Sequence, residues 1–343
     1  MTADAYARAG VDLAKVSSIR SSLAKDLAST FSTRKGKLGR PVIPIGHYAG
    51  LIDIGGKKLL AMHTDGVGTK VLVAQAMHRF DTVGIDCIAM TVNDLVCVGS
   101  EPLAILDYIA LEMEDPILVQ ELAKGLVKGA REAGVAIVGG ETAVMGDTVK
   151  GFDLVSMGVG WVERKRLIDG SAIRAGDAII GVGSTGLHSN GYTLARRVLL
   201  RERNVTDKVD ELGETVGEAM LRPTRIYVKP TLEALSKSEV HGIAHITGGA
   251  FAKLTRLVAK RNLEFAIEKL PRIPLFALLQ SEGRLSDAEM YRTFNMGIGL
   301  CVVAPGSEVE GIVSCFKKRR MYASQIGTVR RGSGVVVGGV RIA

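Results

Sequence analysis

The sequence has few cysteines, few aromatic residues and no long apolar run. Among its 343 residues are four cysteines, one tryptophan and 5% aromatic residues. No two cysteines form a C-x-x-C pair and no histidine stands at finger spacing from them, which argues against a zinc site or a disulfide framework. We therefore expect four reduced, mostly buried thiols at Cys87, Cys97, Cys301 and Cys315.

Signals for membrane insertion and secretion are also missing. The apolar runs are interrupted by glycine or by charge well before the roughly 20 residues that a membrane helix requires. The N-terminal stretch carries Asp4, Arg8 and Asp12, and it lacks the apolar segment of a secretory signal. We expect a cytoplasmic protein with no membrane partner.

Positive charge is in excess but is not concentrated. The formal net charge is +8 and the isoelectric point is about 9.3. The densest basic runs, at residues 34–37, 317–320 and 330–331, have no interleaved aromatic side chains, which argues against a platform for single-stranded nucleic acid. A general positive field would still favour a phosphorylated small molecule. We therefore expect no nucleic-acid partner.

Helical and strand patterns alternate along the whole chain, which predicts an α/β or α+β fold with mixed sheets. A helix is predicted within residues 1–30, with Asp12 as a possible N-cap. Residues 33–56 are rich in glycine and proline and are expected to form a loop. The charged segment at residues 163–177 predicts a boundary between a domain of residues 1–166 and a domain of residues 167–343. Strands are predicted at residues 59–63, 103–111, 135–138, 154–162, 178–183, 263–267, 295–304, 325–329 and 335–342, and helices at residues 82–98, 116–133, 191–203, 224–237, 251–261 and 307–320.

A Gly-rich turn follows the first of these strands. Its residues are Asp65, Gly66, Val67, Gly68, Thr69 and Lys70. Two glycines let a ligand approach the backbone, the lysine offers a positive charge for phosphate, and the aspartate offers an oxygen to a hard cation such as Mg²⁺. The spacing is not that of a Walker A loop. An ordinary strand-turn-helix junction would explain the same residues about equally well.

Two further acidic motifs could serve a cation. Asn93 and Asp94 stand inside a predicted helix beside apolar residues, so at least one should approach a buried face, where a carboxylate needs a partner. Glu141 follows a Gly-Gly pair at the predicted end of a short strand, where ligands gather in α/β folds. A hydrogen bond within the helix and an exposed turn residue are the plainer alternatives.

Two turns begin with a histidine and precede predicted helices. The first contains His188, Ser189 and Asn190, and the second contains His245, Thr247, Gly248 and Gly249. Ser189 or Asn190 is expected to cap the helix that follows, whose free N–H groups would suit a phosphate. A histidine could donate to phosphate or move a proton, although a single histidine is more often structural.

Taken in this order, the motifs resemble those of the aminoimidazole ribonucleotide synthetase (phosphoribosylformylglycinamidine cyclo-ligase) family. The resemblance covers essentially the whole chain and also rests on YARAGVD at residues 6–12, GIDCIAMTVND at 84–94, IDGS at 168–171, HSNGY at 188–192, LRPTRIYV at 221–228 and EMYRTFNMGIG at 289–299. DGVGTK and GGET recur in a wider ATP-binding superfamily that includes formylglycinamidine ribonucleotide synthetase, selenophosphate synthetase, thiamine-monophosphate kinase and a hydrogenase maturation factor. HSNGY and MYRTFNMGIG narrow the match to the cyclo-ligase.

The resemblance implies two α/β domains around a cleft, and a homodimer whose N-terminal domains share a β-barrel-like interface. It implies that ATP, with Mg²⁺, closes formylglycinamidine ribonucleotide into aminoimidazole ribonucleotide, releasing ADP and phosphate. On this basis Mg²⁺ would be held by Asp65, Asp94 and Glu141, and the ATP phosphates would be contacted by Lys70, Asn93 and residues 66–69. The substrate would be contacted by His188, Ser189, Asn190, Thr247, Gly248, Gly249 and Asn295, with Lys70 and one of the two histidines, His188 or His245, assisting the chemistry.

The chain departs from the family pattern in two places. Residues 36–50 hold only four glycines, with Pro41 and Pro44 among them, which leaves open how a loop there would close over ATP. Val144 takes the second acidic position of the family's GGETAEMPG stretch, so that contact is lost unless Asp147 replaces it. The alternatives that remain are a related enzyme such as formylglycinamidine ribonucleotide synthetase, and a non-catalytic nucleotide-binding protein.

Overall fold

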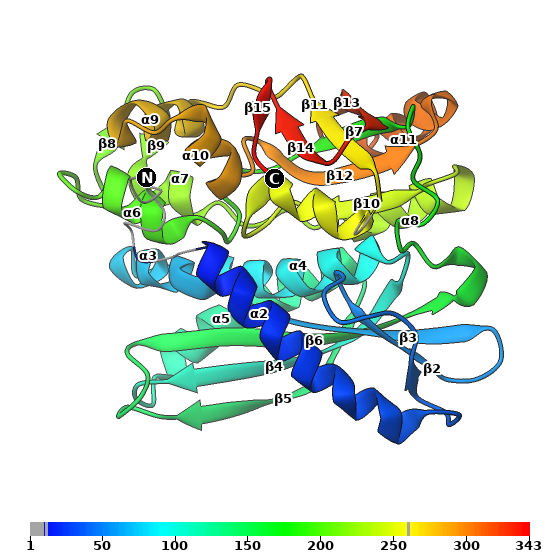
Figure 1. The fold of residues 1–343 in the computed structure, drawn as a ribbon. Helices are drawn as coiled ribbons and strands as arrows, with labels where there is room; N and C mark the ends of the chain where they lie inside the picture. The colour runs from blue at the N-terminus through cyan, green and yellow to red at the C-terminus, as the bar shows by residue number, and fades with distance from the viewer. Residues whose placement is uncertain (1–9, 11–12, 259–260) are drawn as a thin grey trace.

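The computed structural model describes residue 10 and residues 13–258 and 261–343. Its two halves are stacked, as Figure 1 shows: residues up to 163 build a sheet in the lower half, and residues from 178 build a sheet in the upper half. The mixed α/β class predicted from the sequence is confirmed. The predicted helix cap at Asp12 lies outside the described residues.

The N-terminal sheet has one face covered by helices. In the described part of the chain its strands are ordered β1 (Arg40–Pro41), β2 (Gly50–Asp53), β3 (Lys58–Gly66), β6 (Phe152–Glu163), β4 (Glu101–Leu111) and β5 (Ala136–Val144). The pairs are antiparallel except β4 with β5, which α5 (Pro116–Ala133) connects as a crossover. The segment predicted to be a loop at residues 33–56 thus contains two short strands. Before them lie α2 (Leu13–Ala28) and the 3₁₀ turn η1 (Ser29–Arg34).

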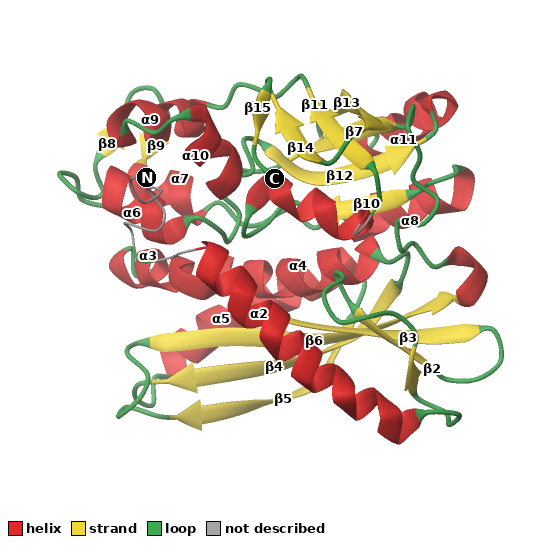
Figure 2. Ribbon diagram, in the orientation of Figure 1, coloured by secondary structure: helices red, strands yellow, loops and turns green. Residues whose placement is uncertain are grey.

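The C-terminal sheet mixes strand directions. Its strand order in the described residues is β10 (Gly242–His245), β12 (Ile298–Ala304), β7 (Ala178–Gly183), β13 (Ala323–Arg331), β11 (Leu263–Ile267), β14 (Gly334–Val337) and β15 (Val340–Arg341). Figure 2 shows helices around it. They include α6 (Tyr192–Leu199), α7 (Val216–Leu221), α8 (Val228–Lys237), η4 (Ala250–Val258), α9 (Pro274–Gly283), α10 (Asp287–Thr293) and α11 (Val309–Lys317).

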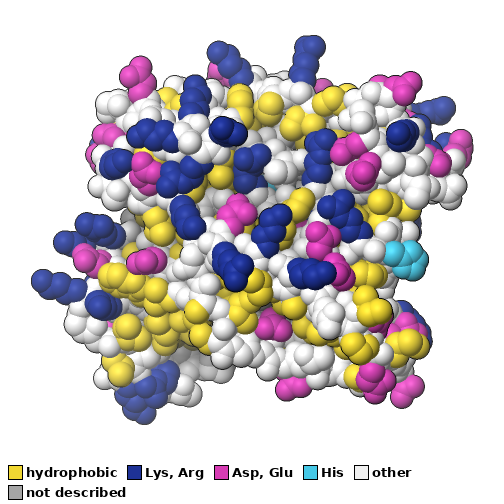
Figure 3. All heavy atoms as spheres, turned by 180° about the vertical axis from the view of Figure 1, so that it is seen from behind, with side chains coloured by type: hydrophobic (Ala, Val, Ile, Leu, Met, Phe, Trp, Pro, Cys, Tyr) yellow, Lys and Arg dark blue, Asp and Glu magenta, His cyan; other side chains and the backbone are white. Residues whose placement is uncertain are grey.

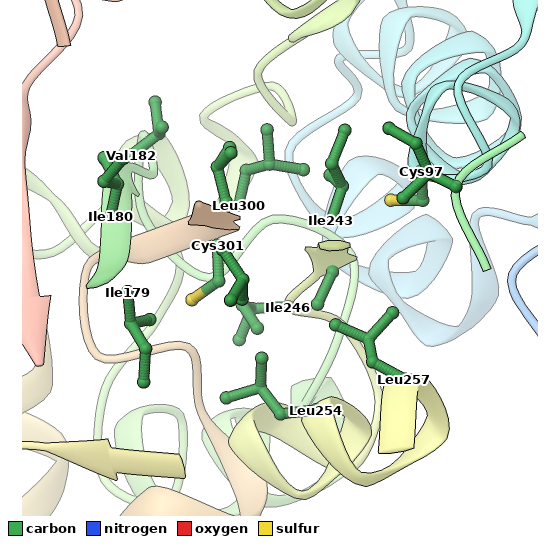
Figure 4. Packing of buried hydrophobic residues seen from close by; sticks show 14 of the residues in the cluster. Cys97, Ile179, Ile180, Val182, Ile243, Ile246, Leu254, Leu257, Leu300 and Cys301 are labelled. Atoms are coloured by element: carbon green, nitrogen blue, oxygen red, sulfur yellow. The ribbon is translucent and has the colours of Figure 1, made fainter. Parts of the chain in front are cut away.

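Helix α4 (Asp81–Cys97) lies between the two halves, and residues 82–97 are all buried. It crosses α5 at glycines: a Cβ on Gly84 would stand 2.5 Å from the Leu122 carbonyl oxygen, and one on Gly125 2.1 Å from that of Asp81. Only hydrogen atoms at these positions allow the two backbones to approach so closely. Figure 4 shows Cys97 of this helix beside Ile243 of β10, so the C-terminal core extends to α4.

The structure corrects three local predictions. The strand predicted at residues 135–138 extends to Val144, so the GGET motif lies inside β5 and not in a turn after it. The helix predicted at residues 251–261 is the 3₁₀ segment η4. The cap of α6 is Gly191 in the left-handed region (φ 78°), and neither Ser189 nor Asn190 caps it with a side chain. Glycine adopts that conformation without steric cost, which removes the need for a polar cap at this turn.

Candidate active site

Helix α4 presents a polar stripe to the C-terminal half. Asp86, Asn93 and Asp94 lie at positions i, i+7 and i+8, which share one face of a helix. Their exposed fractions are 0%, 0% and 2%. Asp86 and Asn93 contact the 222–227 segment, Asp94 contacts His245, and together these contacts hold the site.

Asp86 is the centre of a buried hydrogen-bond network. Its Oδ1 accepts from Lys70 Nζ at 2.9 Å, from the Thr224 backbone N–H at 2.7 Å and from the Thr224 hydroxyl at 2.5 Å. Ser189 donates to the same oxygen at 3.2 Å, and Lys70 Nζ lies 2.7 Å from Oδ2. The network therefore joins the Gly-rich turn of the N-terminal half to the histidine turn and the 222–227 segment of the C-terminal half.

Lys70 is committed to this network. Its side chain is fully buried, and its Nζ also donates to the Arg222 carbonyl at 2.7 Å. Burial lowers the pKa of the ammonium, and the charge of Asp86 opposes that shift. The structure thus places Lys70 in a salt bridge and gives it no exposed surface toward a nucleotide phosphate.

Asn93 fixes the neighbouring backbone. Its Nδ2 donates to the Arg225 carbonyl at 2.8 Å, and its Oδ1 accepts from the Tyr227 N–H at 2.9 Å. The same amide nitrogen lies 3.4 Å from His245 Nε2. Because both ends of the amide are engaged by protein groups, Asn93 serves here as a support for the 225–227 segment.

Asp94 connects two histidines. Its Oδ1 lies 2.7 Å from Nδ1 of His245, and its Oδ2 lies 3.4 Å from Nε2 of His63. Burial by itself would raise the pKa of Asp94, but the His245 hydrogen bond, the positive charge of Lys253 and the nearby His63 ring lower that pKa to about 2. The carboxylate is therefore ionised at neutral pH.

His63 and Lys253 were not identified from the sequence. His63 Nε2 also lies 4.0 Å from Asp65 Oδ2, so this ring stands between two of the predicted cation ligands. Lys253 donates to the Thr247 hydroxyl, and its Nζ lies 6.0 Å from the centre of the Tyr48 ring. His63 ends the strand predicted at residues 59–63, directly before the Gly-rich motif, and its place there is a signal that the sequence reasoning missed. Lys253 looks like an ordinary helix lysine and carried no sequence signal.

Hydrogen bonds of the buried His188 ring stabilise the first histidine turn. His188 is 1% exposed, and its Nε2 accepts from the N–H groups of Thr185 at 3.2 Å and Arg225 at 3.5 Å. Burial, together with the charges of His245, Lys70 and Arg225, holds the pKa of His188 well below its usual range. His188 is thus a neutral ring that shapes the turn. His245 is likewise fully buried.

The two histidine turns lie next to each other. A Cβ built on Gly248 would stand 2.9 Å from Oδ1 of Asn190. Asn295 supports the first turn, because its Nδ2 donates to the Gly186 carbonyl at 2.8 Å and its Oδ1 accepts from Ser184 at 3.0 Å. Most of the predicted substrate residues are therefore gathered in one place, where Gly248 is exposed and Asn190 is half-buried.

Glu141 stands apart from the other two predicted cation ligands. Asp65 is in register with Ser156, Asp107 and Gly140 across β3, β6, β4 and β5. Glu141 follows at the edge of the sheet, so three strand spacings of about 4.8 Å separate its strand from that of Asp65. Within the described residues of one chain, no group of three His, Cys, Asp or Glu side chains is arranged to hold a metal ion.

A mainly apolar cavity of 260 Å³ opens beside His63. Its other walls come from η1, from the segment at residues 41–52 and from β3. The side chains that line it include Phe31, Pro41, Ile43, His47, Tyr48 and Met62. It therefore places an apolar recess next to the polar cluster around Asp94.

Comparison with known proteins agrees with this architecture. Residues 46–162 match the N-terminal domain of AIR synthase related proteins, and residues 174–339 match their C-terminal domain. The fold and these two matched domains thus define an AIR synthase related protein. The phosphoribosylformylglycinamidine cyclo-ligase of Pyrococcus furiosus is 48% identical over 333 residues, covering 97% of each chain. The chain belongs to the phosphoribosylformylglycinamidine cyclo-ligase family.

Solved structures share the fold at low sequence identity. AaThiL complexed with AMPPCP and TMP has a TM-score of 0.65 and 19% identity, covering 92% of this chain and 93% of that chain. T. maritima PurL complexed with FGAR has a TM-score of 0.60 and 18% identity, covering 92% of this chain and 49% of that chain. Within the described residues, no helix combines the length and apolarity needed to cross a membrane.

Proposed function

We propose that this chain catalyses the ATP-dependent cyclisation of formylglycinamidine ribonucleotide to aminoimidazole ribonucleotide in purine biosynthesis. The observation that carries the proposal is the 48% identity to a cyclo-ligase over 97% of both chains. The AMPPCP bound to AaThiL supports ATP as the co-substrate, and the FGAR bound to T. maritima PurL supports a related ribonucleotide as the substrate. Among the residues that the structure describes, no feature of the site favours the alternative activities. A cytoplasmic location is part of the proposal.

The reaction requires activation of a poor leaving group. The γ-phosphoryl group of ATP is transferred to the formyl oxygen, and ADP leaves. An amidine nitrogen then attacks the formyl carbon, the bond from that carbon to the phosphorylated oxygen breaks, and the ring closes with loss of phosphate and a proton. The protein contributes mainly positioning and neutralisation of phosphate charge.

The cleft residues suit these tasks in different ways. The turn that holds Gly248 and Gly249 offers backbone N–H groups to phosphate oxygens, whereas in the Gly-rich turn the N–H groups of Gly66 and Val67 already donate to Asp65 and to the Leu154 carbonyl. The apolar cavity beside His63 is a suitable recess for a flat purine base, which gains from burial against apolar side chains. Asp86 and Asn93 hold the turns in place from α4.

Mg²⁺ is part of the expected co-substrate, where it would neutralise phosphate charge. Asp65 and Asp94 flank His63 and could contribute oxygen ligands, but one chain does not assemble the three predicted carboxylates. We therefore assign no step to the metal. Glu141 as a cation ligand stays a prediction. It concerns a dimer, because β5 is an edge strand with which a second copy of the chain can pair.

A homodimer through the N-terminal sheet is the second part of the proposal. Strand β5 is an edge strand of nine residues whose side chains are mostly exposed, and a long exposed edge favours pairing with another chain. The sheet also exposes Leu106, Tyr108, Val138 and Met157. In Figure 3, hydrophobic side chains gather on the lower, N-terminal half, whereas Lys and Arg side chains gather over the upper half. Burial of this apolar surface would stabilise a dimer with a barrel-like interface.

ADP release by the purified protein tests the function. With MgATP, we expect release that depends on formylglycinamidine ribonucleotide and is matched by formation of aminoimidazole ribonucleotide. Glu141→Gln should abolish turnover if Glu141 serves the cation site of the assembly. If folded wild-type protein shows no turnover stimulated by this substrate, the proposal fails, and other substrates of the superfamily become the next to test.

A further inference from the structure

The two lysines of the cleft differ in how far their charges are satisfied. Both oxygens of the Asp86 carboxylate lie within 3 Å of Lys70 Nζ, and that nitrogen has a third partner in the Arg222 carbonyl. Among the described residues, the ammonium of Lys253 has only one hydrogen bond, to the uncharged hydroxyl of Thr247. An ammonium has three N–H donors, so two donors of Lys253 remain available.

The Asp94 carboxylate, whose charge acts most strongly on Lys253, is already engaged by two histidines. The two oxygens of Asp94 face His245 and His63, at 2.7 Å and 3.4 Å. Lys253 makes no ion pair with any residue that the structure describes. Burial lowers the pKa of its ammonium, and the charges of Asp94 and Asp65 oppose that effect. A half-buried cation without a paired anion loses part of its hydration, which a bound anion would compensate.

The surroundings of Lys253 also leave room and donors for an anion. The N–H groups of Gly248 and Gly249, in the turn that Lys253 contacts through Thr247, donate to no described backbone or side-chain acceptor. A Cβ built on Gly249 would meet nothing within 4 Å, so open space lies beside the turn. Arg256, one turn further along η4, adds positive charge, with its guanidinium 5.6 Å from the centre of the Tyr48 ring.

We propose that Lys253 is a further catalytic residue, whose ammonium contacts phosphoryl oxygens in the cleft during the transfer from ATP. The phosphate contact predicted for Lys70 is thereby assigned to Lys253. Lys70 acts instead as a positioning residue, through its salt bridge with Asp86. This inference rests on the proposed function. The phosphoryl oxygens could belong to the group that ATP transfers or to the phosphate of the ribonucleotide, and the kinetics distinguish these two.

The test compares Lys253→Gln, Lys253→Met and Lys253→Arg with wild-type protein and with Lys269→Met, an exposed lysine of the same half. Glutamine keeps a donor for Thr247 but removes the charge. We expect kcat/KM to fall about 100-fold in Lys253→Gln and Lys253→Met, the usual effect of removing one electrostatic group that stabilises a transition state. Lys253→Arg should recover part of the activity, and Lys269→Met should match wild type. Unfolding midpoints should stay within the range of the control.

Separate measurement of kcat and of the KM for each substrate identifies which phosphoryl oxygens Lys253 contacts. A fall in kcat or a rise in the KM for ATP places Lys253 at the transferred phosphoryl group, whereas a rise confined to the KM for the ribonucleotide places it at the substrate phosphate. Activity of folded Lys253→Gln within twofold of wild type would overturn the inference. An inactive wild-type protein would instead refute the proposed function. In that case, equal affinities of wild type and Lys253→Gln for both MgATP and formylglycinamidine ribonucleotide, measured by calorimetry, would overturn the inference too.

Discussion

Asp86 and Thr224 join the two halves of the molecule at a fully buried point. The carboxylate accepts both the backbone N–H and the hydroxyl of Thr224, while Lys70 balances its charge from the N-terminal half. The relative position of the Gly-rich turn and the histidine turn therefore depends on one ion pair. Loss of the cation would leave a charge buried without compensation.

We expect Lys70→Met to destabilise the protein by about 3–5 kcal/mol, because removing one partner strands the other charge in the interior. Lys124→Met, which removes an exposed lysine paired with Glu121, is the control and should leave stability unchanged. Urea denaturation followed by circular dichroism measures both. Equal midpoints for the two variants would show that Asp86 is solvated or protonated in the folded protein.

The neutral state of His188 should appear in the pH dependence of stability. The pKa of the buried ring is held well below its usual range, whereas in the unfolded chain it is about 6.5. The unfolded state therefore binds the extra proton first as the pH falls, and the contribution of His188 to stability is present above about pH 6.5 and is lost progressively below it.

The variant His188→Asn isolates this contribution, since asparagine tolerates the left-handed backbone (φ 63°) found at this position. The difference in unfolding free energy between wild type and His188→Asn should shrink between about pH 7 and pH 5. Chemical denaturation at a series of pH values provides the measurement. A difference that stays constant over this range would mean that His188 keeps its ordinary pKa.

The crossing of α4 and α5 should not tolerate a methyl group. Gly125→Ala would place a Cβ 2.1 Å from the Asp81 carbonyl oxygen, so one helix must move. We expect a loss of stability of about 1–3 kcal/mol or more, as for other overpacked sites. Gly306→Ala has nothing within 4 Å of its Cβ and serves as the control. Thermal unfolding that is equal for the two variants would contradict the tight crossing.

A lysine introduced on the exposed face of the N-terminal sheet should prevent the proposed dimer from forming. Val138 is 64% exposed on β5 and Met157 is 38% exposed on β6, so a lysine at either position is solvated in a single chain but would be buried in the dimer. Val138→Lys and Met157→Lys are therefore expected to elute as monomers in size-exclusion chromatography with light scattering. Leu72→Lys on α3 (Val71–Ala76), another exposed apolar position, should behave as wild type. A monomeric wild-type protein would refute the dimer.

The sequence predicted most elements whose pattern is local. Residues 116–133 show why: Asp115 caps α5 by accepting from the N–H groups of Ile117 and Leu118, Pro116 begins the helix, and Gly134 ends it in the left-handed region. Each of these signals acts within a few residues. The short helices α7, α9 and α10 were not predicted, because six to ten residues give too few periodic positions.

By itself the sequence determined the α/β class, the order of the motifs and the family, because these depend on residue types and spacing along the chain. Only the tertiary structure decided which polar side chains meet. It placed Lys70 in a salt bridge with Asp86, turned His188 inward, set Glu141 at the far edge of the sheet and brought Lys253 to the Thr247 turn. The partner of a buried charge is set by long-range packing, and residues 151 positions apart, such as Asp94 and His245, share no local signal.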